Sequence, residues 1–127
     1  MYISFDFQSE VPLYQQLRNQ IVIAISKGEL QPGDHLPTVR GLSDESGVNV
    51  MTISKAYQLL KQEGYISTER RGGAVVSANT SELKVSTDLV SRLQLCISEL
   101  RVAGFGEEQI IDLCRRLYKD EYIQGVR

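Results

Sequence analysis

The stretch TVRGLSDESGVNVMTISKAYQLLKQEG, residues 38–64, decides the fold of this 127-residue chain. Thr38 is a residue type that caps helix N-termini, and it precedes a short helix predicted over residues 39–45. Gly47 marks a tight turn, and a second helix is predicted over residues 50–63. Two helices joined by a short glycine-containing turn are the sequence outline of a helix-turn-helix.

The helix over residues 50–63 has a suitable residue at each end and one apolar face. Asn49 can cap its start, and Gly64 ends it, as glycine commonly does after the last helical turn. Its apolar residues recur at intervals of three and four, which indicates a face that packs into a core. These residues are Ile53, Ala56, Tyr57 and Leu60.

Ahead of this stretch, an amphipathic helix is predicted from Val11 to Lys27. Pro12 fits its first turn, where a missing N–H costs nothing, and Gly28 ends the helix. A turn over residues 31–34 then leads into the helix-turn-helix. The apolar positions of the predicted helix are Leu13, Leu17, Ile21, Ala24 and Ile25.

Beyond Gly64 the apolar pattern changes from a helical period to a period of two. This change predicts two strands, residues 65–69 and 74–77, joined by a turn at residues 70–73. A β-hairpin directly after a helix-turn-helix is a wing. The sequence therefore predicts a mainly α fold with a small β-hairpin, in which residues 1–78 form a winged helix-turn-helix domain.

A polar connection over residues 78–81 leads to a tail, residues 79–127, in which two helices are predicted on either side of Gly104 and Gly106. Neither helix can bury its apolar face alone. We therefore expect a twofold homodimer, in which a second copy of the tail covers these faces. The expected dimerisation residues are Leu89, Leu93, Ile97, Leu100, Ile110, Leu113 and Leu117.

The net charge of −2 counts mildly against DNA binding, but the local charge pattern favours it. No acidic residue lies between Gly47 and Gln62, whereas Lys55 and Lys61 both do. Phosphate contact depends on the charge of one face and not on the total. A helix in the major groove reaches base edges with its N-terminal side chains. The start of the helix over residues 50–63 is therefore the candidate interface with double-stranded DNA.

Polar side chains at and before that start are the candidate contacts. Thr52 and Ser54 offer hydroxyls for phosphate oxygens, and Lys55 offers a cation, with a solvated surface lysine as the alternative. Asn49 can pair with a base, cap the helix, or do both. Arg40, early in the preceding helix, can reach the backbone or a base edge. The predicted DNA-binding residues of the two helices are Thr38, Arg40, Asn49, Met51, Thr52, Ser54 and Lys55.

Two further features of this interface have two interpretations each. Val50 and Met51 either contact thymine methyl groups or pack on the first two helices. The wing tip, residues 70–73, either enters the minor groove or forms a plain turn with a solvated charged pair. DNA binding is favoured for the wing tip because it follows a helix-turn-helix. The wing-tip residues are Arg70, Arg71, Gly72 and Gly73.

Composition disfavours several other classes of protein. The N-terminus lacks a basic start and an apolar signal core, and no long apolar stretch occurs, so we expect a cytoplasmic protein with no membrane partner. His35 is the only histidine, and we expect no metal, no cofactor and no enzyme active site. Cys96 and Cys114 fall on apolar faces of predicted helices and are interpreted as buried free thiols. A redox switch or an intersubunit disulfide is the alternative.

The motifs resemble those of the GntR family of transcriptional regulators. Residues 36–40, LPTVR, are similar to the family's Leu-Pro-Ser-x-Arg signature, and residues 12–34 resemble its first helix and turn. Residues 70–73 look like its wing tip. The resemblance covers about residues 10–77. The short helical tail is similar to that of the YtrA subfamily, in which two small dimerisation helices replace a large effector domain.

The resemblance implies a dimeric repressor that binds an inverted-repeat operator, and regulators of this subfamily commonly repress operons for ABC transporters. The residues by themselves predict only DNA binding and pairing of two chains. Two alternatives stay open. One is a sensor that holds a small-molecule effector in a pocket at the dimer interface. The other is a winged-helix module that binds a protein in place of DNA.

Overall fold

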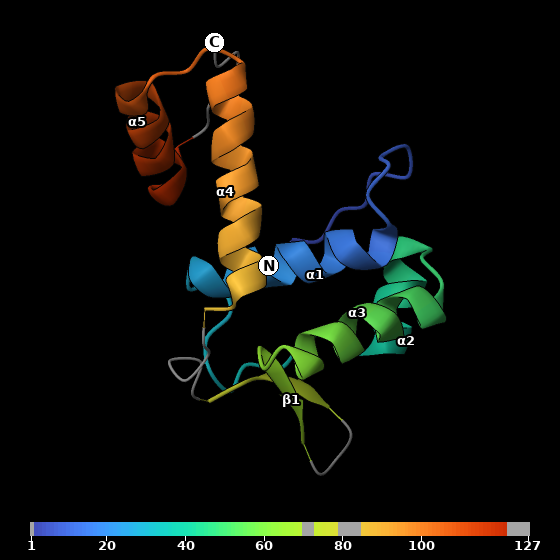
Figure 1. Cartoon of the computed structure of the whole chain (residues 1–127). Coiled ribbons are helices and arrows are strands. Elements are labelled where there is room, and N and C mark those ends of the chain that lie inside the picture. The colour runs from blue at the N-terminus through green and yellow to red at the C-terminus, as the bar shows by residue number, and fades with distance from the viewer. Residues whose placement is uncertain (1, 70–72, 79–84, 122–127) are drawn as a thin grey trace. The chain divides into compact units, whose positions relative to one another are not determined.

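The computed structural model separates the chain into two compact units, Met1–Leu83 (unit 1) and Lys84–Arg127 (unit 2) (Figure 1). The described residues are 2–69, 73–78 and 85–121. The domain boundary predicted at residues 78 and 79 adjoins the segment 79–84, which lies outside the described residues. The mainly α fold with a small β-hairpin is confirmed.

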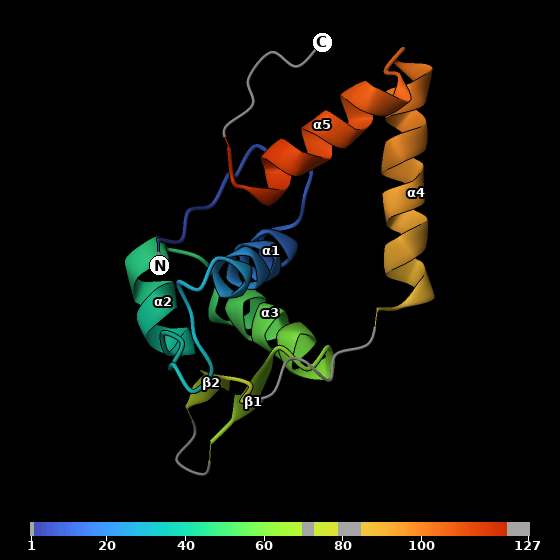
Figure 2. The same ribbon diagram turned by 90° about the vertical axis from the view of Figure 1, so that its left-hand side faces the viewer.

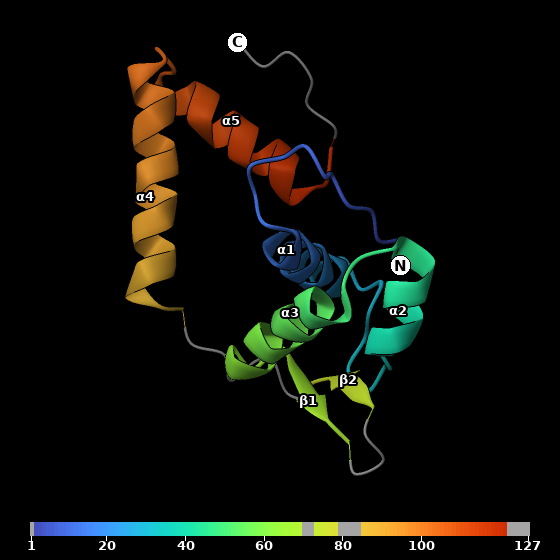
Figure 3. The same cartoon turned by 90° about the vertical axis from the view of Figure 1, so that its right-hand side faces the viewer.

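Within its described residues, unit 1 has the element order of a winged helix. The elements are α1 (Leu13–Ser26), α2 (Val39–Ser46), α3 (Val50–Gln62), β1 (Ile66–Thr68) and β2 (Ala74–Val76). Two side views show α1 lying along one side of α3, α2 packed against α3, and the hairpin on the far side of α3 from α1 (Figures 2 and 3). The helix-turn-helix and the wing therefore share one core.

The first helix begins two residues later and ends one residue earlier than predicted. The expected start at Val11 is wrong, because Pro12 has an extended ψ of 145° and is the N-cap residue that precedes Leu13. Gly28 follows the helix with a φ of +77°, in the left-handed region that side chains with a Cβ rarely adopt.

The backbone of the linker between α1 and α2 pairs with β2. Three hydrogen bonds make the pairing: Gly33 N–H to Val76 O at 3.0 Å, Val76 N–H to Asp34 O at 2.9 Å, and Leu36 N–H to Ala74 O at 2.9 Å. The turn predicted over residues 31–34 is present, with Asp34 N–H donating to Gln31 O at 2.9 Å. These bonds attach the wing to the helix-turn-helix through the main chain.

Side-chain caps begin both helices of the helix-turn-helix, as predicted. Thr38 Oγ1 accepts the Gly41 N–H at 3.0 Å, and Asn49 Oδ1 accepts the Met51 N–H at 2.7 Å. Gly47 has a φ of +77° between the two helices. The caps satisfy backbone donors that a helix start leaves unpaired, so they hold the direction in which each helix leaves the turn.

The core of unit 1 lies between the three helices and the hairpin. The predicted apolar face of α3 is confirmed, since its buried residues are Ile53, Ala56, Tyr57 and Leu60. The buried residues of α1 are Leu17, Ile21 and Ala24. Full burial of a leucine or isoleucine side chain contributes about 1.5–3 kcal/mol, so these faces supply most of the stability of the unit.

Two glutamines on α1 hold the N-terminal segment that precedes the helix. Gln20 accepts the Ser4 N–H at 3.0 Å and donates to Ser4 O at 2.6 Å. Gln16 does the same with Asp6, at 2.9 Å in each direction. Each amide side chain thereby offers the donor and the acceptor that a neighbouring strand would offer. The apolar side chains of the segment that pack against the core are Ile3 and Phe5.

A charged pair joins α1 to the end of α3. Arg18 donates through Nε and Nη2 to the two carboxylate oxygens of Glu63, at 2.9 and 2.8 Å. The hydrogen bond to Glu63 raises the pKa of the Arg18 guanidinium. The guanidinium carbon also lies 5.6 Å from the centre of the Tyr65 ring. A two-pronged pair of this kind fixes direction as well as distance.

The hairpin is antiparallel, with Ser67 opposite Val75 in its register. Glu69 N–H donates to Gly73 O at 2.8 Å just beyond the paired strands. The two predicted strands are confirmed in place, although each is shorter than expected. The turn residues 70–72 lie outside the described residues.

Unit 2 contains α4 (Thr87–Val102) and α5 (Glu107–Tyr118) in its described residues. Ser86 caps α4, because its Oγ accepts the Leu89 N–H at 3.0 Å. Gly104 has a φ of +98° between the two helices. Two tail helices separated at the glycines are therefore present, as predicted.

The interpretation of the two cysteines as buried thiols is wrong for the single chain. Cys96 on α4 and Cys114 on α5 are both free and exposed. The reason is that the faces that carry them are not covered within one chain: α4 has no buried side chain at all.

Removal of the Tyr57 hydroxyl tests the link between α3 and α2. Tyr57 is buried on α3, and its hydroxyl donates to Pro37 O, just before α2, at 2.6 Å. We expect Tyr57→Phe to lower the free energy of unfolding by about 1–2 kcal/mol in urea denaturation, because the Pro37 oxygen loses its donor. The control Tyr118→Phe alters a 90% exposed ring and should leave the midpoint unchanged.

The stabilities of the wild type and Tyr57→Phe can also be compared as a function of pH. Burial raises the pKa of Tyr57 from 10.0 to about 12. Because the folded pKa lies above the unfolded one, the stability that the neutral hydroxyl contributes is intact below pH 10.0 and is lost as the pH rises toward 12. The advantage of the wild type over Tyr57→Phe should therefore shrink across this window. An advantage that grows with pH would contradict the assignment.

Candidate nucleic-acid interface

The exposed face of α3 runs the whole length of the helix. Met51, Lys55, Gln58 and Gln62 recur at intervals of three and four, and all four are exposed. Thr52 and Ser54 lie half-buried at the margins of this face. No acidic side chain is present on it, because α3 contains none. The face therefore offers hydroxyls, amides, one cation and one apolar tip.

The structure distinguishes between DNA contact and internal packing for Met51 at the start of α3. Met51 is 78% exposed and Val50 44% exposed, so the Met51 side chain does not pack on the first two helices. An apolar side chain held out at a helix start suits contact with a thymine methyl group. The capping role of Asn49 is present, with its Oδ1 on the Met51 N–H. Its amide nitrogen stays available as a donor.

Lys55 is held against an aromatic ring of α1. Its Nζ lies 4.1 Å from the centre of the Tyr14 ring, within range of a cation–π interaction. Tyr14 and Lys55 line an open hollow whose other walls are Met51, Thr52, Ser54 and Gln58. The lysine is thus positioned at the edge of the exposed face on the side of α1. The sequence contained both residues but gave no sign that they meet.

The start of α2 and the wing border the same region. Thr38 and Arg40 are exposed, and Thr38 Oγ1 caps its own helix. At the wing, Gly73 lies where a Cβ would stand 3.4 Å from the His35 ring, so a larger residue would press on that ring. Of the predicted wing tip, Arg70, Arg71 and Gly72 lie outside the described residues.

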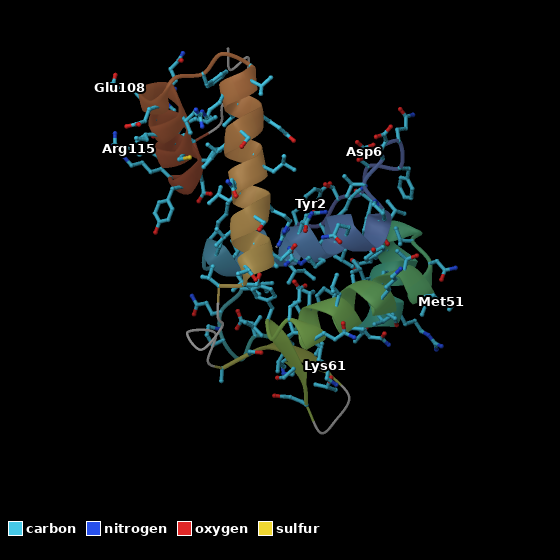
Figure 4. All side chains as sticks on the ribbon, viewed as in Figure 1. Tyr2, Asp6, Met51, Lys61, Glu108 and Arg115 are labelled. Atoms are coloured by element: carbon cyan, nitrogen blue, oxygen red, sulfur yellow. The ribbon has the colours of Figure 1, made fainter. Side chains whose placement is uncertain are left out.

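Neither Gln58 nor Lys61 is among the contacts predicted from the sequence, where Lys61 counts only for its charge and Gln58 is not named. Gln58 and Lys61 are exposed in the second half of α3, and both line a cleft that reaches the wing and the start of α2. In Figure 4, Lys61 lies on the side of α3 that faces the hairpin, while Met51 lies at the other end of the helix. The sequence contains a signal for Gln58, because positions 51, 55, 58 and 62 lie on one helical face.

The predicted dimerisation residues differ in burial within the single chain. Leu89, Leu93 and Leu117 are exposed, Ile97, Leu100 and Leu113 are half-buried, and Ile110 is buried. Further apolar side chains of α4 are also open to solvent: Val90, Leu95 and Val102. Unit 2 therefore presents apolar surface that one chain leaves uncovered.

No group of three or more His, Cys, Asp or Glu side chains among the described residues could hold a metal ion. None of the helices in this part of the chain is long and apolar enough to span a membrane.

A helix-turn-helix with an attached wing and an acid-free exposed helix face defines a winged-helix DNA-binding protein. The model for "Bacterial regulatory proteins, gntR family" matches residues 13–76. The "HTH-type transcriptional repressor YtrA" of Bacillus subtilis is 33% identical over 121 residues, which cover 93% of each chain. The chain belongs to the GntR family, and it is a transcriptional regulator and not an enzyme.

Solved structures agree with this assignment. A crystal structure named as a transcriptional antiterminator from Listeria monocytogenes EGD-e matches 98% of each chain, with a TM-score of 0.84 and 27% identity. The DNA-binding domain of AraR in complex with operator ORX1 matches 59% of this chain and 93% of its own. Its TM-score is 0.51 and its identity 30%.

The cation–π contact can be tested with DNA of any sequence. Tyr14→Leu removes the ring under Lys55, and we expect its affinity for a random duplex at low salt to fall about two- to fivefold, as loss of an exposed cation–π contact would give. Tyr14→Phe keeps the ring and should bind like the wild type. The measurement is fluorescence anisotropy with a labelled duplex. Equal losses in both variants would show that the hydroxyl matters and not the ring.

Proposed function

We propose that this regulator is a homodimeric repressor that binds an inverted-repeat operator. The observation that carries the proposal is the exposed, acid-free face of α3, with Met51 held out at its start and Lys55 fixed at its edge. Met51 reads a base edge through apolar contact, while Thr52, Ser54 and Lys55 hold phosphate oxygens. Repression then follows from occupancy, because the bound protein blocks polymerase at the promoter.

The other predicted DNA contacts come from the start of α2, the start of α3 and the wing tip. Thr38 and Arg40 contact the backbone or a base edge from the start of α2, and Asn49 adds a donor at the tip of α3. The wing tip, Arg70, Arg71, Gly72 and Gly73, enters the minor groove beside it. The AraR domain in complex with its operator supports the proposal, because it matches the winged-helix unit at 30% identity.

The dimer part of the proposal is supported by unit 2. α4 has no buried side chain, and Leu89 and Leu93 on it are about half exposed in the single chain. A second copy of the same tail offers apolar faces of the same size and, by twofold symmetry, covers both. Two winged helices joined in this way meet two half-sites, so the operator is an inverted repeat.

The resemblance to the YtrA subfamily extends the proposal to an operon for an ABC transporter and to a cytoplasmic location. Both stay predictions. An effector pocket at the dimer interface also stays a prediction, and a stabilising metabolite in a thermal-shift screen would support it. Against the protein-binding alternative, the proposal requires DNA binding that weakens as salt rises.

Footprinting on the intergenic DNA beside the gene tests the operator and the dimer together. We expect a protected inverted repeat with half-sites about 34–36 Å apart, because two recognition helices of a twofold dimer lie one helical turn apart. The matched control is Leu93→Glu, which should sediment as a monomer and protect the repeat poorly. A single unrepeated protected site would contradict the dimer model.

Two alanine variants test whether Met51 recognises a base while Arg71 contributes affinity on any DNA sequence. Arg71→Ala should weaken binding about equally on all sequences, because a charge near the backbone or minor groove acts broadly. Met51→Ala should change the preference at one operator position by about 1–3 kcal/mol, the range for a base contact. Anisotropy titrations on the operator, on single-base variants of it and on a random duplex supply both numbers. Uniform losses from both variants would refute this assignment of roles.

A further inference from the structure

A cleft of about 410 Å³ lies in unit 1 between the start of α2, the second half of α3 and the hairpin. Its floor is apolar and includes Leu36 and Ile66, whereas Thr38, Gln58 and Lys61 form part of its rim. The cleft is separate from the hollow between Tyr14 and Lys55, although Gln58 borders both. The DNA contacts predicted from the sequence do not include any residue in the second half of α3. The α3 side chains that line this cleft therefore have no role in the predicted interface.

The charge of the cleft is positive. Lys61 is the one charged side chain among the described residues that line it. Lys61 also has no carboxylate partner among the described residues. The N-terminal end of α2 contributes Thr38 and Val39 to the wall, and a helix start carries a partial positive charge. An anion at the rim therefore meets the Lys61 ammonium group and hydroxyl and amide donors, and none of the described residues that line the cleft carries a negative charge.

The hydrogen bonding inside the cleft favours an anion at the rim over one at the floor. The Tyr57 hydroxyl lines the cleft but already donates to Pro37 O at 2.6 Å. The hydroxyl of Thr38 caps α2 as an acceptor and keeps its proton to donate. The available donors are thus Thr38, Gln58 and Lys61, which stand around the mouth.

The position of Lys61 relative to Lys55 indicates which anion this is. The two lysines are six positions apart in the helix, which places them roughly 9 Å apart along the axis and about 120° apart around it. Lys55 lies on the side of α1 and Lys61 on the side of the hairpin. They therefore flank the exposed face that carries Met51 and Gln58. A major groove about 12 Å wide has a phosphate backbone along each side of such a face.

We propose that this cleft binds one backbone phosphate of the operator, on the strand across the groove from the phosphate that Lys55 contacts. Lys61 supplies the cation, and Thr38 and Gln58 donate hydrogen bonds to the phosphate oxygens. The proposal rests on the proposed DNA-binding function and adds a second anchor to it. With an anchor on either side, the start of α3 is held in the groove at a set depth.

A salt series with Lys61→Gln tests the anchor. Loss of one phosphate contact should weaken binding about five- to tenfold at about 0.1 M salt and reduce the slope of log K against log salt by about 0.9. The loss should be the same on the operator and on a random duplex, because a phosphate carries no sequence information. Lys61→Arg keeps the charge and should restore most of the affinity. The matched control is Lys119→Gln, which removes one exposed lysine charge from unit 2.

Ethylation interference on the footprinted operator locates the contact. Ethylation neutralises single phosphates, so one position should impair the wild type and leave Lys61→Gln unaffected. If Lys61→Gln keeps the wild-type affinity, salt slope and interference pattern, the anchor is refuted while the wild-type footprint still supports the proposed function. If the wild type binds no DNA at any salt concentration, the proposed function fails and the anchor fails with it.

Inorganic phosphate is the alternative occupant of the cleft, because it presents the same kind of anionic oxygens as a backbone phosphate. Millimolar inorganic phosphate should leave the thermal midpoint of both the wild type and Lys61→Gln at the value found in chloride of equal ionic strength. A rise confined to the wild type would assign the cleft to a small anion and overturn the assignment to the DNA backbone.

Discussion

The hydrogen bond from the Tyr57 hydroxyl to Pro37 O is the contact on which the proposed DNA-binding surface depends. Tyr57 lies in the middle of α3, and Pro37 stands directly before the cap of α2. The bond therefore sets where α2 begins relative to the exposed face of α3. Tyr57 is buried on the α3 side, so loss of its hydroxyl removes a donor from inside the protein. Arg18 and Glu63 hold the far end of α3 against α1 in the same way.

Local charge separates the binding surface from the rest of an acidic chain. The net charge is −2, yet α3 contains two lysines and no carboxylate. Each lysine has a different neighbour, since Lys55 lies over the Tyr14 ring and Lys61 at the mouth of the cleft. A helix face with cations at both margins and apolar and amide groups along its middle can be held by phosphates and still read bases.

Much of unit 1 could be predicted because its signals are local. Thr38, Gly47 and Asn49 act within a few residues of themselves, so a cap or a turn can be recognised in one sequence. The pairing of residues 33–36 with β2 could not, because it joins segments far apart in the chain and uses backbone groups that every residue has. The contact of Tyr14 with Lys55 is non-local too. Gln58, in the second half of the proposed binding face, was predictable in principle, because it continues the helical period that begins at Met51.

Unit 2 shows where a single-chain prediction fails for a physical reason. The sequence placed Cys96 and Cys114 on apolar faces, and apolar faces are normally buried. The inference holds only if the chain itself supplies the cover. α4 spans 16 residues without one buried side chain, and isolated helices of that length are marginal in water. Much of the apolar surface of the tail is therefore left for contacts outside the chain to cover. If a second copy supplies them, folding of the tail and pairing of the DNA-binding units are one equilibrium, and the affinity for two half-sites depends on protein concentration.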